Sequence, residues 1–312
     1  MSEVQAPYVT LDVFTSKRFK GNPVAIVKVA NIDLSQEQKQ RIAKEFNFSE
    51  TVFLHPAIGD GNPRVDIFTP VNEMEFAGHP IIGAGHFLFR QLLANNHTNS
   101  MTVITKAGPV PIEYDTTNKT VSAEVPHNIH IHQQAASLNH IAPVHACLAN
   151  ASDLKGVPES SPVISVVKGV TYALVDLTER PDVFANIGPG GSPALDLDEG
   201  WGPSFTGVMY HRHLGSHKEG ELVVWDLRVR MVAIDLEDPA CGSGGSSLGA
   251  HIALSNAEKG QHHRFCIGQG IEMGRDSLVI VDVILDEERK KVSTIKLAGH
   301  AAFVAEGSIF VE

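Results

Sequence analysis

Alternating apolar and polar residues, a pattern typical of strands with one buried face, recur along most of the chain. Residues 8–14 alternate with a period of two. The apolar run 24–29 follows a turn made by Gly21, Asn22 and Pro23. These two runs predict a hairpin with Asn22 at its tip.

A helix is predicted next, because Ser35 and Gln38 form a capping box at its start and the apolar stripe ends near Phe46. A strand follows at 47–54 and another at 64–70. The remaining strands of the first half are expected at 101–104, 110–114 and 120–125.

The second half of the chain repeats this succession. Residues 163–167 and 172–177 predict a second hairpin. Arg64-Val and Arg228-Val, 164 positions apart, each begin a strand that leads through a small-residue turn into a helix. A repeat of a whole supersecondary unit predicts two similar lobes.

The first of these helices is expected to begin near Pro80 and to end near Asn95, and the second to begin near Ser246. Helix N-termini bind anions, because their first N–H groups lack partners and the helix dipole is positive there. The turn at 238–249 also carries an acid, a thiol and hydroxyls, namely Asp238, Cys241, Ser243, Ser246 and Ser247. We therefore expect it to form part of a small-molecule site.

Three functions remain open for this turn: a nucleotide cradle, a cysteine catalyst, or a carboxylate-binding turn in an acid–base enzyme. A dinucleotide fingerprint needs glycine at its first, third and sixth positions. Gly242 and Gly244 fit, but the sixth position is Ser247, and the chain contains no P-loop motif. The nucleotide cradle is therefore disfavoured.

Glu50 is a candidate proton-transfer group, because it lies at a predicted helix-to-strand junction among Phe48, Val52 and Phe53. Apolar neighbours disfavour a charged carboxylate and raise its pKa toward the range useful for proton transfer. From spacing alone, a solvated loop glutamate is the competing interpretation.

Composition narrows the class of protein. The 312 residues are enough for two domains, and a formal net charge of −11 argues against nucleic-acid or anionic-membrane partners. No apolar run reaches the roughly 18 residues of a membrane-spanning helix, and the first 20 residues lack the pattern of a signal peptide. Three widely spaced cysteines suggest a reducing, cytoplasmic setting.

Histidine pairs raise the question of a metal site. His130 and His132 would share one face of a strand, and His211 and His213 have the same spacing. No cysteine or carboxylate cluster accompanies the first pair in the sequence. We therefore expect surface histidines and no metal.

Six motifs taken together resemble one family: 12–15 with 19–23, 48–53, 64–70, 76–80, 238–243 and 269–277, which include Phe-Ser-Glu-Thr-Val-Phe, Phe-Ala-Gly-His-Pro and Asp-Pro-Ala-Cys-Gly-Ser. In this order they resemble the phenazine-biosynthesis (PhzF-like) isomerase family, within the diaminopimelate-epimerase fold. The resemblance spans nearly the whole chain.

The resemblance implies an α+β fold of two pseudo-symmetric lobes, each a sheet wrapped around a central hydrophobic helix, with the active site in the cleft between them. The N-terminal lobe would comprise 1–126 and 301–312, with the last strand returning to it. The C-terminal lobe would comprise 127–300. Two short strands are expected near the end, at 301–304 and 307–311.

The resemblance also implies roles for single residues. Glu50 would shuttle the proton, His79 would assist it, and Asp238 would complete the catalytic set. Substrate contacts would come from five further positions: Asn22, Gly78, Gly242, Ser243 and Gly244.

Related racemases use two cysteines, one on each face of the substrate carbon. Cys241 occupies one of those positions, but the partner position in the first lobe is Ala77. A single carboxylate can instead move a proton between two positions on one face of the substrate. The sequence therefore predicts a cofactor-independent isomerase that uses Glu50.

The expected substrate is a small anionic, carboxylated metabolite that is cyclic or unsaturated, and the resemblance suggests a homodimer. Two alternatives stay open: a non-catalytic metabolite-binding or protein-interaction member of the fold, and a cysteine-type epimerase or dehydratase that uses Cys241.

Overall fold

The computed structural model describes residues 4–29, 32–57, 61–93, 98–149 and 154–311. It is a mixed α+β protein built mostly of strands. The chain separates into two compact units, one formed by 1–125 with 297–312 and the other by 126–296. Among the described helices, none is both long enough and apolar enough to cross a membrane.

Within its described residues, unit 1 contains the helices α1 (Gln36–Phe46) and α2 (Gly78–Leu93). Its strands are β1 (Val4–Val13), β2 (Asn22–Lys28), β3 (Glu50–His55), β4 (Arg64–Phe68), β5 (Glu73–Met74), β6 (Ser100–Thr105), β7 (Gly108–Asp115), β8 (Thr120–Glu124) and β20 (Ala301–Val311).

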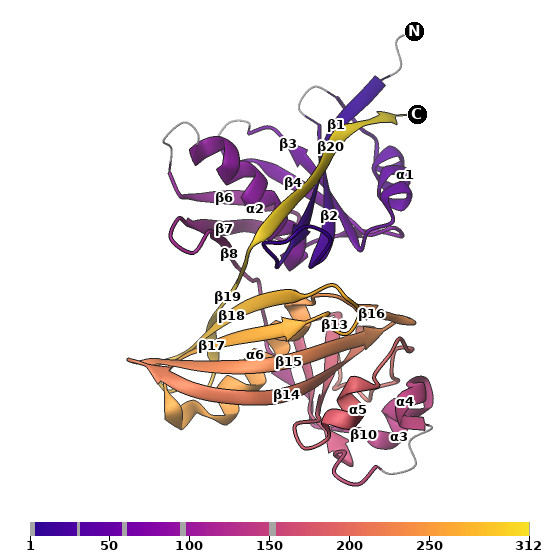
Figure 1. Cartoon of the computed structure of the whole chain (residues 1–312), viewed down its shortest axis with the longest axis vertical. Coiled ribbons are helices and arrows are strands. Elements are labelled where there is room, and N and C mark those ends of the chain that lie inside the picture. The colour runs from indigo at the N-terminus through magenta and orange to yellow at the C-terminus, as the bar shows by residue number, and fades with distance from the viewer. Residues whose placement is uncertain (1–3, 30–31, 58–60, 94–97, 150–153, 312) are drawn as a thin grey trace. The chain divides into compact units, whose positions relative to one another are not determined.

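The strands of unit 1 pair in a regular succession. β1 and β2 form the predicted antiparallel hairpin, and β3 then lies parallel to β2. β4 is antiparallel to β3, and β6, which follows α2, is parallel to β4. β7 and β8 extend the sheet as antiparallel neighbours. The last strand, β20, lies antiparallel to β1, as Figure 1 shows.

α2 packs closely against this sheet because glycines remove side chains from its contact face. A Cβ at Gly83 would lie 2.8 Å from Val24, and one at Gly85 would lie 2.7 Å from Val121. Both distances are shorter than side chains tolerate in a packed interior. The helix is therefore held close to the strands on either side of it.

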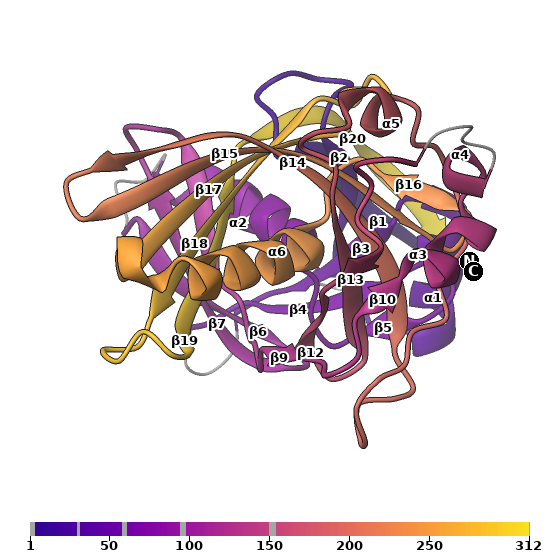
Figure 2. The same cartoon turned by 90° about the horizontal axis from the view of Figure 1, so that it is seen from below.

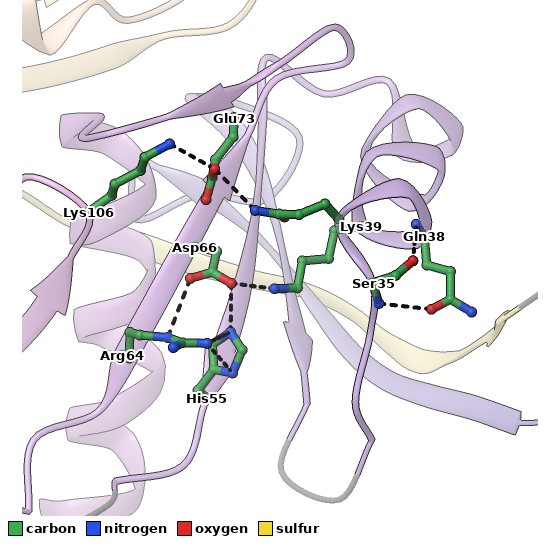
Figure 3. A network of polar contacts seen from close by, with 9 residues as sticks. Ser35, Gln38, Lys39, His55, Arg64, Asp66, Glu73 and Lys106 are labelled. Carbon is green, nitrogen blue, oxygen red and sulfur yellow. Dashed lines mark hydrogen bonds and ion pairs between the residues drawn. The ribbon is translucent and has the colours of Figure 1, made fainter.

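α1 is fixed to the sheet by a charged contact that is largely buried. Lys39 Nζ lies 2.5 Å from Asp66 Oδ2 on β4, and His55 Nε2 on β3 lies 2.8 Å from the same oxygen. Figure 3 shows these groups converging on Asp66. Their hydrogen bonds hold the pKa of Asp66 well below its usual range, against the effect of burial. α1 and β3 are thus held in register around the chain segment that carries Glu50.

Unit 2 contains the helices α3 (Leu138–Ile141), α4 (Ala146–Ala149), α5 (Pro181–Ala185) and α6 (Gly242–Ser255), with 3-10 turns at Ala142–Val144 and Ala257–Lys259. Its strands are β9 (His130–Ile131), β10 (Ala136–Ser137), β11 (Ser160–Ser161), β12 (Val163–Val167), β13 (Val170–Asp176), β14 (Phe205–Glu219), β15 (Leu222–Ala233), β16 (Leu236–Asp238), β17 (His262–Gln269) and β18 (Ser277–Leu285). β19 (Val292–Gly299) spans the boundary between the units.

Unit 2 repeats the succession of pairings seen in unit 1. β12 and β13 are antiparallel, and β14 is parallel to β13. β15 is antiparallel to β14, and β17, which follows α6, is parallel to β15. The strands that contain the two matched Arg-Val motifs, β4 and β15, therefore occupy equivalent places in the two units.

α6 lies against the sheet of unit 2, as Figure 2 shows beside β17 and β18. A Cβ at Gly249 would lie 2.9 Å from Phe265, and one at Gly245 would lie 3.2 Å from Ile267. Phe265 is itself fully buried and packs beside the rings of Trp225 and His263, so it has little room to move. Close approach of helix and sheet again depends on glycine.

Two predicted boundaries were wrong. α6 begins at Gly242, four residues before the predicted start at Ser246, because tight packing against the sheet overrides the low helix propensity of its glycines. The final strands at 301–304 and 307–311 are one continuous strand, β20, because β1 pairs with it over its whole length across one bulge. The predicted end of α2 at Asn95 lies outside the described residues.

A buried ion pair anchors β16, the strand that leads into the turn before α6. Arg230 on β15 donates to both carboxylate oxygens of Glu237, each at 2.7 Å, and both side chains are only 5% exposed. Arg230 also donates to the carbonyl oxygens of Phe184 and Ala185. The guanidinium therefore makes four hydrogen bonds that hold β15, β16 and α5 together.

We predict that Glu237→Ala lowers the free energy of unfolding by about 3–5 kcal/mol, because it leaves the buried guanidinium of Arg230 without its counter-charge. Urea unfolding followed by circular dichroism measures this loss. The matched control is Glu288→Ala, which breaks a pair with Lys290 whose side chains are 73% and 75% exposed. Exposed pairs contribute only ~0–1 kcal/mol, so equal losses in the two variants would contradict the prediction.

Candidate active site

Glu50 is the first residue of β3, four residues after the last residue of α1. Asn47 caps α1 in the left-handed region, with φ of 51°, and turns the chain sharply toward the sheet. β3 then pairs in parallel with β2, with Glu50 opposite Val24. The interpretation of Glu50 as a solvated loop residue is wrong, since its side chain is only 17% exposed.

His79 lies beside Glu50, although the two are far apart in the sequence. It is the second residue of α2 and is 6% exposed, and its Nδ1 lies 3.2 Å from Glu50 Oε2. That oxygen is buried and accepts no well-aligned hydrogen bond from any residue within the described ranges. The preceding residue, Gly78, begins α2 where a Cβ would lie 2.5 Å from Leu297.

Asn22 completes the group in unit 1. It is the buried first residue of β2, and its Oδ1 lies 3.2 Å from the hydroxyl of Ser49. That hydroxyl also hydrogen-bonds the carboxyl group of Glu50. Because a serine hydroxyl has one proton, it can donate to only one of these acceptors at a time. The structure thus brings together the four predicted residues of unit 1: Asn22, Glu50, Gly78 and His79.

Burial raises the pKa of Glu50 from its ordinary value of 4.5 to about 7, and the hydrogen bond from Ser49 only partly opposes this rise. Removal from water disfavours the charged carboxylate, which is the larger effect here. A carboxyl group with a pKa near neutrality is populated both as acid and as base. Such a group can take a proton and return it.

In unit 2, the turn from β16 into α6 is held by Gln269 of β17. The backbone N–H of Cys241 donates to Gln269 Oε1 at 3.1 Å, and Gln269 Nε2 donates to the carbonyl oxygen of Asp238 at 2.8 Å. The carboxylate of Asp238 accepts from the N–H of Ala240 at 2.9 Å. Gln269 belongs to one of the sequence motifs, but its role as a clamp could not be read from the sequence.

Cys241 is the N-cap of α6 and accepts a hydrogen bond from the N–H of Gly244 at 3.3 Å. Burial, aided by the negative charge of Asp238, raises the pKa of its thiol to about 12. The thiol is therefore protonated at neutral pH. Its position is explained by capping, a structural role, and no reactive thiolate is required.

Ser243 contacts a residue that the sequence did not reveal as part of the site. Its hydroxyl lies 2.7 Å from the hydroxyl of Tyr172 on β13, which is also 3.4 Å from the thiol of Cys241. Tyr172 was predicted only as a strand residue, and its alternation with buried neighbours gave no sign of this contact. Of the other hydroxyls, Ser246 and Ser247 bond helix carbonyls one turn back, so they are not directed outward.

The start of α6 thus gathers the predicted residues of unit 2, namely Asp238, Gly242, Ser243 and Gly244. Gly244 is buried, and a Cβ there would collide with Met209 of β14. The N–H of Gly244 donates to the thiol of Cys241. The N–H groups of Gly242 and Ser243, together with the Ser243 hydroxyl, form a pattern that suits a carboxylate or another small anion.

The histidine pairs differ from expectation. His132 is buried, and Asp198 approaches both His130, at 2.7 Å, and His132, at 3.9 Å. The expectation of surface histidines without a nearby carboxylate is therefore wrong for this pair, because the loop before β14 brings Asp198 back to β9. Among the described residues, a second group joins Asp176 to His211 and His213.

The phenazine biosynthesis-like (PhzC-PhzF) family model matches residues 11–184 and 229–307. A trans-2,3-dihydro-3-hydroxyanthranilate isomerase from Pseudomonas aeruginosa is 29% identical over 311 residues, which cover 97% of this chain and 99% of the relative. These matches include the segments that carry both groups of candidate residues.

Solved structures agree on the fold. A phenazine biosynthesis protein from Bacillus anthracis superposes with a TM-score of 0.75 at 23% identity, over 99% of this chain and 100% of that one. A hydroxyproline epimerase from Agrobacterium vitis gives a TM-score of 0.55 at 13% identity, over 99% and 92%. These identities are low, so the likeness is one of fold.

Fold and relatives together place the chain among the isomerases. It belongs to the phenazine biosynthesis-like family, as the resemblance in its motifs predicted.

We predict that Glu50→Gln stabilises the protein at pH 8 but not at pH 4. The folded-state pKa of Glu50, about 7, lies above its ordinary value of 4.5, so the wild type loses stability as the pH rises between these values. The full difference corresponds to about 3 kcal/mol, and glutamine does not ionise. Urea unfolding of both proteins across this pH range measures the gap.

The control is Glu45→Gln, an exposed substitution of the same kind on α1. A gap between wild type and Glu50→Gln that stays constant from pH 4 to pH 8, or one matched by the control, would show that burial does not raise the pKa of Glu50.

Proposed function

We propose that this protein is a cofactor-independent isomerase that moves a proton within a small carboxylated metabolite, cyclic or unsaturated, with Glu50 as the general acid and base. The observation that carries the proposal is the position of Glu50: it is held beside His79 and its pKa is raised to about 7 by burial.

In this reaction the Glu50 carboxylate takes a proton from a carbon next to a double bond or carbonyl group. The neutral carboxyl group then returns that proton to a second carbon of the same molecule as the double bond shifts. No net proton is gained or lost. His79, 3.2 Å away, keeps the carboxyl group in place during both steps.

The anionic group of the substrate would be bound by the N–H groups at the start of α6, with the Ser243 hydroxyl assisting and Asp238 completing the set. Tyr172 would orient Ser243 through the contact between their hydroxyls. Positioned donors of this kind also stabilise negative charge that develops when a proton leaves carbon. We infer from the family resemblance that Glu50 and this turn act on the same substrate.

A cysteine mechanism is less well supported. The pKa of Cys241 is raised to about 12, and the residue before Gly78 is Ala77, which carries no exchangeable proton. That mechanism needs one ionised thiol group to take the proton and one neutral thiol group to return a proton.

The substrate named for the Pseudomonas relative, trans-2,3-dihydro-3-hydroxyanthranilate, belongs to the proposed class and is the first compound to test. We predict that the wild-type protein isomerises it and that Glu50→Gln lowers kcat by at least about 100-fold, the usual contribution of a general acid or base. Proton NMR and absorbance spectroscopy follow the reaction.

The matched variant is Cys241→Ser, which removes the thiol but keeps an oxygen that can cap α6. Its kcat should stay within about tenfold of the wild type, since no thiolate chemistry is required. Full activity in Glu50→Gln would reject Glu50 as the proton carrier. Loss of activity in Cys241→Ser alone would favour the cysteine mechanism.

A further inference from the structure

A second group of polar side chains in unit 2 faces a cavity that the proposed reaction does not use. The cavity has a volume of about 290 Å³. It is lined by the last part of α6, by β13 and β14, and by the segment 158–162. The residues that could bind a ligand there are Asp176, His211, His213 and His251.

Strand pairing brings three of these residues together. Asp176 is the last residue of β13, and it pairs with His211 on the parallel strand β14. His213 lies two residues further along β14, and side chains two apart share one face of a strand. One potential ligand atom from each of the three lies within 4.8 Å of the others.

This face of the sheet is the one that packs against α6. Tyr172, four residues before Asp176 on β13, contacts Ser243 of α6. Met209, two residues before His211 on β14, lies against Gly244 of α6. The three potential ligands therefore point toward the helix and the cavity, and away from the opposite face of the sheet.

The Nδ1 atom of His211 is available to bind a metal ion. His211 is only 5% exposed, and its Nδ1 is buried with no hydrogen-bond partner among the residues that the structure describes. His251 on α6 faces the same cavity, and its Nδ1 is likewise buried and without a partner within the described ranges. Buried polar atoms are almost always hydrogen-bonded to protein or to water, so two such atoms lining one cavity are available to water or to a metal ion.

Thr178 fixes the carboxylate and the second histidine in place. Its N–H and its hydroxyl both donate to Asp176 Oδ1, at 2.8 and 2.5 Å, which leaves Oδ2 available. The Thr178 hydroxyl accepts in turn from the backbone N–H of His213 at 2.9 Å. Outer hydrogen bonds that orient ligands in this way are a regular feature of metal sites.

The group formed by His130, His132 and Asp198 lacks these properties. Both ring nitrogens of His132 are engaged, Nε2 with Ser165 at 2.9 Å and Nδ1 with the N–H of Asp198 at 3.0 Å. His130 bonds Asp198 and stacks on Trp201. These contacts satisfy the histidines without a metal.

We propose that Asp176, His211 and His213 bind a divalent transition-metal ion, best represented by Zn²⁺, with water in the cavity as the fourth ligand. Two imidazoles and one carboxylate are a donor set that zinc accepts, at Zn–N and Zn–O distances of ~2.0–2.2 Å. The bound ion would connect β13 to β14 and stabilise unit 2.

The test is zinc binding by tag-free protein that has been treated with EDTA and dialysed, measured by competition with a chromophoric chelator. We expect one equivalent to bind and to raise the Tm. His213→Gln and Asp176→Asn should each weaken binding at least about tenfold. Both side chains are less buried than His211, so these variants are expected to fold even if His211→Ala does not.

His130→Gln is the matched control, since it removes a histidine from the other group of two histidines and an aspartate. It should bind zinc as the wild type does. Co²⁺ offers a second readout, because its visible spectrum reports coordination by histidine. A wild-type affinity weaker than about 100 µM, unchanged binding in His213→Gln and Asp176→Asn, or an equal loss in His130→Gln would overturn the proposal.

Discussion

The structure of each unit depends on one packing constraint, the close approach of a helix to the sheet around it. In α2 and α6 this approach is possible only where glycine leaves out a side chain, as at Gly85 and Gly249. The same glycines weaken the intrinsic tendency to form a helix, by about 1 kcal/mol each relative to alanine. Burial of the surrounding apolar side chains must therefore compensate, so each helix is stable because it packs against its sheet.

This constraint has a direct bearing on the site. A helix held along its whole length has a fixed first turn, and the candidate groups occupy those first turns: His79 in α2 and Ser243 in α6. The strands that pack against the helices also carry the other polar groups of the site: Glu50 begins β3, and Tyr172 lies within β13. Core packing and the placement of polar groups thus have a common cause.

Much of the fold could be predicted from local sequence, because its signals are short in range. The capping box at Ser35 and the hairpin at 163–176 appear as expected. The start of α6 could not be predicted, since its glycines are helical only through contacts with β14 and β17. Ser243 and Cys241 contact Tyr172 and Gln269, which are distant in sequence. Neither tyrosine nor glutamine in a strand is by itself a sign of such a contact. The same holds for Asp198 and Asp176, which tertiary pairing brings to their histidines.

The repeated order of strand pairings invites a comparison of equivalent positions. In unit 1, β3 begins with Glu50 opposite Val24, and in unit 2 the equivalent strand, β14, begins with Phe205 opposite Val170. An acid in one copy is thus matched by an aromatic ring in the other, and that ring packs edge-on against Tyr172. If duplication produced the two halves, only one retained or acquired a carboxyl group at this place. For the isomerisation proposed above, a lone carboxyl group implies suprafacial transfer: an isotopic label removed from one carbon would reappear on the same face of the product.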